Sequence, residues 1–68
     1  MRQYQESDYP VILEAARRTN EVAIAPIARA LMNAGITWPP RFATSDEHNA
    51  RLIDRDILRA WKELGLRP

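Results

Sequence analysis

Residues 46–64 read DEHNARLIDRDILRAWKEL, and this segment contains the most regular helical pattern in the chain. Apolar side chains recur in it at three- and four-residue spacing, which is the spacing of one face of an α-helix. These apolar positions are Ala50, Ile53, Ile57, Trp61 and Leu64. The pattern predicts a long helix over 46–64 with one side packed on a core, and it leaves open a break near Asp54.

The same helix would gather four cations on its solvent side. Arg51, Arg55 and Arg59 are spaced four residues apart, and Lys62 follows. At about 100° per residue these side chains point away from the apolar side. Like charges four apart repel by about 0.2–0.5 kcal/mol per pair, so an anionic partner would turn a cost into a gain. The alternative is an ordinary solvated face, because Arg stems cover apolar surface while their charged ends stay in water.

Leucines and acidic residues border these cations. Leu52 and Leu58 lie off the apolar side of the expected helix, and arginine mixed with exposed aliphatic side chains is a common interface composition. Asp54 and Asp56 point to different sides of a helix, so they do not form a catalytic carboxylate pair. We expect them to flank the basic residues.

A first helix is expected over 9–19. Asp8 can cap its start, Pro10 falls in its opening turn where a missing N–H does no harm, and Asn20 can end it in a left-handed conformation. Residues 1–7 show no consistent period, so we expect a flexible tail there.

A second helix is expected over 25–34. Pro26 disfavours helical geometry before it and suits the first turn of a helix, and Gly35 suits the position after the last turn. Together the three segments predict an all-α fold, with one small three-helix domain over 8–66.

The connector before the third helix is rich in proline. Residues 36–43 read ITWPPRFA, and the paired prolines exclude a helix and a central strand. Trp38 and Phe42 flank the prolines. Either both rings fold back onto the small core, or they form an exposed surface for a partner together with the prolines.

Length and composition restrict the function classes. A chain of 68 residues is one domain at most and buries only about 60% of the surface that its unfolded form exposes. It contains no cysteine and one histidine, which argues against disulfides and a structural zinc site. No segment is long and apolar enough for a signal or a membrane span, so we expect a cytoplasmic protein. The net charge of +1 argues against strong nonspecific binding to nucleic acid.

No pattern of catalytic residues is present. His48 follows two acidic residues, but neighbours in a helix do not converge on one site, and no hydroxyl is placed by a recognisable motif beside a base. We therefore expect no enzyme, no metal, no cofactor and no small-molecule substrate.

The segment 27–37, IARALMNAGIT, followed by Trp38 and later by the segment 57–59, resembles the helix-turn-helix part of recombinase-type and other phage DNA-binding domains. In those domains an IA-x-x-L-N-x-x-G-I helix precedes a recognition helix. The resemblance implies that the third helix enters the major groove and that its arginines contact phosphates or guanine edges. The sequence departs from the pattern by its longer turn before that helix and by the acids at 54 and 56.

Two functions follow as hypotheses. The first is a small DNA-binding regulator of phage or plasmid type. The second is a small phage-type protein-binding module, such as an inhibitor or adaptor of a host protein or a homodimer. A helical fragment of a larger assembly is a third possibility. For either partner, the candidate contact residues are Arg51, Arg55, Arg59, Lys62, Arg41, Leu52 and Trp38.

Overall fold

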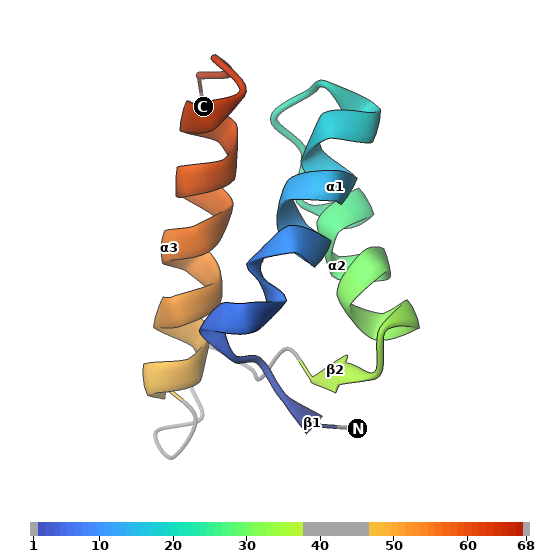
Figure 1. The fold of residues 1–68 in the computed structure, drawn as a ribbon, viewed down its shortest axis with the longest axis vertical. Coiled ribbons are helices and arrows are strands. Elements are labelled where there is room, and N and C mark those ends of the chain that lie inside the picture. The colour runs from blue at the N-terminus through green and yellow to red at the C-terminus, as the bar shows by residue number, and fades with distance from the viewer. Residues whose placement is uncertain (1, 38–46, 68) are drawn as a thin grey trace.

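Three helices make up most of the ordered fold in the computed structural model (Figure 1). The elements in chain order are β1 (Arg2–Gln3), the 3-10 turn η1 (Glu6–Asp8), α1 (Tyr9–Thr19), α2 (Ala25–Asn33), β2 (Ile36–Thr37) and α3 (Glu47–Glu63). The structure describes residues 2–37 and 47–67. The predicted all-α class with three helices is confirmed. The first two residues of the proline-rich connector form β2, whereas Trp38, Arg41 and the other connector residues from 38 onward lie outside the described residues, so the predictions made for them stay predictions.

The helices begin and end where the sequence predicts, to within one or two residues. Asn20 follows α1 with φ 53°, and Gly35 and Gly65 follow α2 and α3 with φ 75° and 74°. Left-handed residues of this kind end helices because they turn the chain back toward the last carbonyl groups. At the end of α3, the Leu66 N–H donates to the Trp61 carbonyl at 2.8 Å, which brings Leu66 back onto the core. α3 is continuous through Asp54.

Residues 2–7 correct the prediction of a flexible tail. β1 pairs in parallel with β2, with Arg2 opposite Ile36, and the Arg2 N–H donates to the Gly35 carbonyl at 2.9 Å. Tyr4 is 2% exposed and belongs to the core. The segment has no helical period because a short strand pair and one buried ring hold it, and neither leaves a repeating pattern in the sequence.

Asp8 also differs from its predicted role. It lies at the start of α1, but its carboxylate makes no capping hydrogen bond to that helix. The carboxylate instead accepts two hydrogen bonds from the Arg2 guanidinium, both at 2.6 Å, and one from the Gln5 N–H at 2.9 Å. Asp8 therefore ties β1 to η1, and the helix begins without a side-chain cap.

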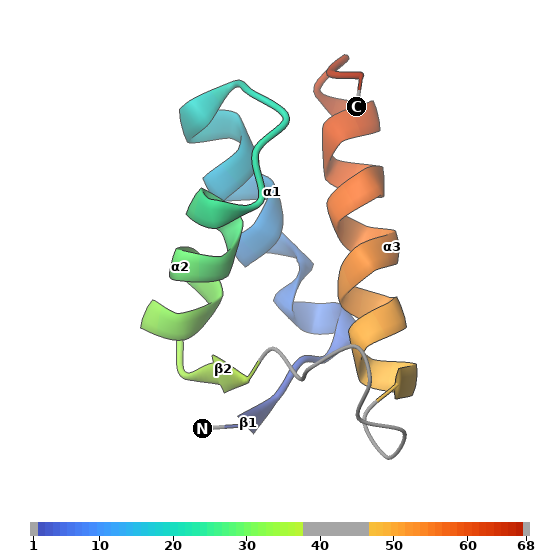
Figure 2. The same cartoon turned by 180° about the vertical axis from the view of Figure 1, so that it is seen from behind.

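The core lies between the three helices, and α1 packs against both α2 and α3. Figure 2 shows α2 and α3 on the near side with α1 behind them. The largest fully buried apolar side chains come from α1, α2, β2 and α3, and they are Ile12, Ile27, Leu31, Ile36 and Ile53. This arrangement buries one side of α3 along its length and leaves the other side in solvent.

Candidate binding surface on α3

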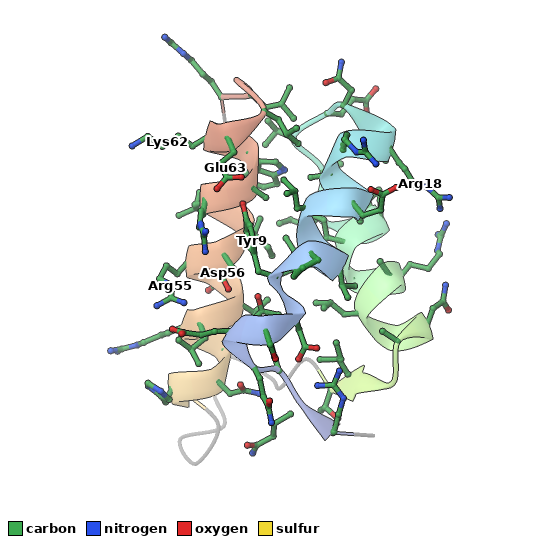
Figure 3. All side chains as sticks on the ribbon, viewed as in Figure 1. Tyr9, Arg18, Arg55, Asp56, Lys62 and Glu63 are labelled. Atoms are coloured by element: carbon green, nitrogen blue, oxygen red, sulfur yellow. The ribbon has the colours of Figure 1, made fainter. Side chains whose placement is uncertain are left out.

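The solvent side of α3 carries the four predicted cations. Arg51, Arg55, Arg59 and Lys62 are all exposed, whereas Ile53, Ile57 and Trp61 of the same helix are buried. Figure 3 shows Lys62 extending away from the rest of the molecule and Arg55 on the outer side of α3. We call Arg51, Arg55, Arg59 and Lys62 the basic face. The helical period thus predicted the position of this surface correctly.

Arg55 is held by carboxylates on both sides. Its Nη2 donates to Glu6 Oε1 at 3.0 Å, and its Nε donates to Asp56 Oδ1 at 3.2 Å. Glu6 lies in η1, so this contact joins the two ends of the sequence. The Arg55 side chain remains 52% exposed, and the guanidinium therefore faces solvent while it is paired.

Arg59 lies over the first residue of α1. The centre of its guanidinium is 4.0 Å from the centroid of the Tyr9 ring, and its Nε donates to Glu63 Oε1 at 3.3 Å. A cation over an aromatic ring at an exposed site contributes about 0.5–1 kcal/mol to stability. An exposed ion pair contributes about 0–1 kcal/mol. These contacts orient Arg59 and can be exchanged for a stronger anionic partner.

Lys62 differs from Arg55 and Arg59. It is exposed in the last turn of α3, where a cation suits the helix dipole, and it makes no ion pair within the described part of the chain.

Arg51 is exposed two turns before Leu58 on the same side of the helix. The two leucines that were predicted to border the cations differ in exposure. Leu58 is 54% exposed, whereas Leu52 is half-buried and packs against the core. Leu52 therefore offers a partner less surface than the sequence suggested.

Asp56 does lie beside a basic residue, since it accepts a hydrogen bond from Arg55, but the sequence did not predict that it is buried. Its carboxylate is in the core, with the residue 1% exposed, and it accepts a hydrogen bond of 2.5 Å from the Tyr4 hydroxyl. Burial first, and then this hydrogen bond, raise the pKa of Tyr4, so the hydroxyl stays protonated and donates. In the sequence, only the position of Asp56 could have indicated its burial, because it directly precedes Ile57 and follows Ile53 by three residues on the apolar side.

An apolar groove lies beside the basic face. Ile24, in the connection between α1 and α2, lines a hollow of about 240 Å³ with Asp54, Ile57, Leu58 and Trp61 of α3. An adjoining hollow of about 480 Å³ is lined by Leu58, Lys62, Gly65, Leu66 and Arg67. We call these two hollows, which share Leu58, the apolar groove.

Sequence reasoning missed this groove because Ile24 belongs to no helix. Ile24 is 45% exposed, and Val22 in the same connection is 40% exposed. Two large apolar residues in the short segment between the first two predicted helices could have indicated an apolar surface there. Their position beside Leu58 depends on how α3 packs against the first two helices.

Within residues 2–37 and 47–67, no three His, Cys, Asp or Glu side chains lie together as a metal site would need. Over the same residues, no helix is long and apolar enough to cross a membrane. No family model, no curated protein and no solved structure matches this chain.

Proposed function

We propose that this chain is a small DNA-binding regulatory protein that contacts the phosphates of duplex DNA through the basic face of α3. The observation that carries the proposal is that α3 presents Arg51, Arg55, Arg59 and Lys62 to solvent while Asp56 of the same helix is buried. One of the two acids that argued against a DNA-facing helix therefore lies away from the surface. Such a protein, of the phage or plasmid type that its resemblance implies, acts in the cytoplasm.

The internal partners of the arginines do not oppose this function. Glu6 and Glu63 are exposed acids, and exposed ion pairs contribute about 0–1 kcal/mol each. A phosphate can accept two hydrogen bonds from one guanidinium, which makes it the stronger partner for Arg55 or Arg59. The internal pairs also hold the two side chains in place, so less rotamer freedom is lost when DNA binds.

The charge of the whole chain limits the kind of binding. A net charge of +1 gives little long-range attraction, so affinity must come from the local contacts of the basic face. α3 has 17 residues and is therefore roughly 25 Å long, and the major groove of B-DNA admits an α-helix. These features support binding at a defined position on DNA over general coating of it.

A salt titration with a matched charge control tests the proposal. The variant Arg51→Gln/Arg55→Gln/Arg59→Gln removes three charges from α3, and Arg17→Gln/Arg18→Gln/Arg29→Gln removes three exposed charges from α1 and α2. Fluorescence anisotropy with a labelled duplex is measured from about 20 to about 150 mM salt. Three or four phosphate contacts predict that the logarithm of affinity falls with the logarithm of salt at a slope of roughly −3.

The α3 variant should lose most of the binding and most of the slope, while the α1–α2 variant keeps both. Equal losses in the two variants would mean that only total charge matters. Absence of binding at the lowest salt would remove the proposal.

A second candidate function, a protein-binding module, is favoured by a separate observation. Ile24 and Leu58 are about half exposed, come from distant parts of the sequence and line the same hollow. Exposed apolar side chains gathered in a hollow are typical of protein-binding surfaces. Light scattering separates the two forms of this candidate, since a homodimer doubles the mass in solution and an adaptor for another protein does not.

A further inference from the structure

We propose that the apolar groove binds an acidic amphipathic segment of another protein, whose apolar side chains cover Ile24 and Leu58 while its carboxylates pair with Lys62 and Arg67. This inference rests on the second candidate function and names the chemistry of its partner. It does not depend on DNA binding, although Lys62 belongs both to the basic face and to the groove.

The floor of the groove supplies the apolar part of the contact. Leu58 is 54% exposed and Ile24 is 45% exposed, and the buried residues Ile57 and Trp61 line the same hollow. We therefore expect the two exposed side chains to keep their position when a partner covers them. A segment with two apolar side chains can place one in each of the two hollows, which share Leu58.

The charges around the groove select the sign of the partner. Lys62 and Arg67 line the larger hollow, and neither makes an ion pair within the described residues. Arg55 and Arg59, in contrast, are each paired with a carboxylate of this chain. The cations at the groove are thus the ones for which a partner's carboxylates add new pairs without displacing old ones.

Asp54 determines which way the partner segment lies along the groove. It lines the smaller hollow, at the end of the groove away from Arg67. A carboxylate of the partner placed there would meet a like charge, whereas one placed at the larger hollow meets two cations. The acids of the partner therefore lie toward the C-terminal end of α3.

Trp61 provides an independent observation. The residue is 5% exposed and lines the smaller hollow, and its indole Nε1 is buried without a hydrogen-bond acceptor in the described structure. Buried donors are rarely left unpaired in folded proteins. A backbone carbonyl of a partner seated in the hollow would be a suitable acceptor for this N–H.

A second copy of this chain fits the groove less well than an acidic segment. Two copies that meet through Leu58 bring together two sets of Lys62 and Arg67, whereas the acid that lines the hollows in each copy is Asp54. Like charges at the centre of an interface oppose association. Charge complementarity therefore favours a partner that is acidic.

A selection from a displayed library of random peptides of about twelve residues tests the inference on the wild-type protein, because it samples both charge signs and all apolar patterns. We expect the enriched peptides to combine large apolar residues with Asp or Glu. Enrichment of basic peptides, of peptides that lack apolar residues, or of none would overturn the inference.

Variants then locate the site. Leu58→Ser and Lys62→Glu/Arg67→Glu should each weaken binding of an enriched peptide by about tenfold or more in fluorescence anisotropy. Met32→Ser is the matched control, because Met32 is a 64% exposed apolar side chain on α2 that lines neither hollow. Circular dichroism checks that each variant is folded. Peptides whose affinity is unchanged in both groove variants bind elsewhere and would contradict the assignment.

The two proposals fail separately. Leu58→Ser should leave the salt dependence of DNA binding unchanged, and Arg51→Gln/Arg55→Gln/Arg59→Gln should keep the peptide affinity within about twofold. A wild-type protein that light scattering shows to be dimeric, and that becomes monomeric on Leu58→Ser, would replace the acidic partner by a second copy of the chain.

Discussion

Tyr4 and Tyr9 are both buried in the N-terminal part of the chain, but their hydroxyl groups have opposite surroundings. The Tyr4 hydroxyl donates to the buried Asp56 carboxylate at 2.5 Å. The Tyr9 hydroxyl is buried near the Glu63 carboxylate but makes no hydrogen bond of normal geometry with a described residue; burial first, and then the interaction with Glu63, raise its pKa. The Tyr4 hydroxyl therefore stabilises a buried charge, whereas the burial of the Tyr9 hydroxyl is not offset by a hydrogen bond of normal geometry.

Removal of each hydroxyl should change stability in opposite directions. Tyr4→Phe leaves the Asp56 carboxylate without its donor, so the free energy of unfolding should fall by about 1–3 kcal/mol. Tyr9→Phe keeps the ring beneath Arg59 and removes an unpaired polar group, so the free energy of unfolding should stay the same or rise by up to about 1 kcal/mol. Urea unfolding followed by circular dichroism measures both, and each variant is the control for the other. No loss of stability on Tyr4→Phe would show that Tyr4 contributes through its ring alone.

Among the elements, β1 and η1 depend on a single carboxylate. The Arg2 guanidinium, by its hydrogen bonds, holds the pKa of Asp8 below its usual value. A carboxyl whose pKa is lower in the folded than in the unfolded state adds stability above its unfolded pKa of about 3.9, and this contribution is lost as the pH falls. The attachment of the N-terminal segment should therefore weaken in acid.

The variant Asp8→Asn tests this. At neutral pH its free energy of unfolding should be lower than that of the wild type by about 1 kcal/mol, and the difference should shrink as the pH falls below about 4. Urea unfolding at a series of pH values measures the difference directly. Glu14→Gln is the control, since Glu14 pairs with Arg17 and Arg18 on the surface of α1. A difference that is the same at every pH would mean that Asp8 acts by its shape and neutral hydrogen bonding.

The elements also show what the sequence can predict. All three helices were predictable because each combines apolar residues at helical spacing with a residue suited to end it, as Gly65 does for α3. The pair of β1 and β2 was not, because two residues per strand give no period and the partners are 34 positions apart, since Arg2 pairs with Ile36. Local patterns determine helices, whereas a short parallel pair depends on the packing that brings its strands together.

At the scale of the molecule, the same division applies to the candidate surfaces. The exposed position of the basic face follows from the period of one helix. The pairing of Arg55 with Glu6 does not, because Glu6 lies 49 residues before Arg55 and reaches it only through the docking of η1 on α3. The apolar groove likewise needs the connection between α1 and α2 to lie beside α3. Tertiary packing therefore decides which of the predicted side chains can meet a partner.

The small size of the whole molecule makes it sensitive to single core changes. A 68-residue domain has a free energy of unfolding of roughly 3–10 kcal/mol. Ile12 is fully buried on α1, the helix that packs against both others, and truncation of such a side chain costs about 2–5 kcal/mol. Ile12→Ala should therefore remove a large part of the total stability.

Thermal unfolding by circular dichroism measures this effect. Each kcal/mol lost should lower the Tm by about 4–8 °C in a domain of this size, so Ile12→Ala should melt at least roughly 10 °C below the wild type. Met32→Ala is the control, because Met32 is 64% exposed and its truncation should change stability by no more than about 0.5 kcal/mol. If Ile12→Ala and Met32→Ala melt together, α1 does not join the other two helices in one cooperative core. The proposed surfaces on α3 would then have to be held by contacts other than those of α1, because η1, Tyr9 and the connection that carries Ile24 are all attached to that helix.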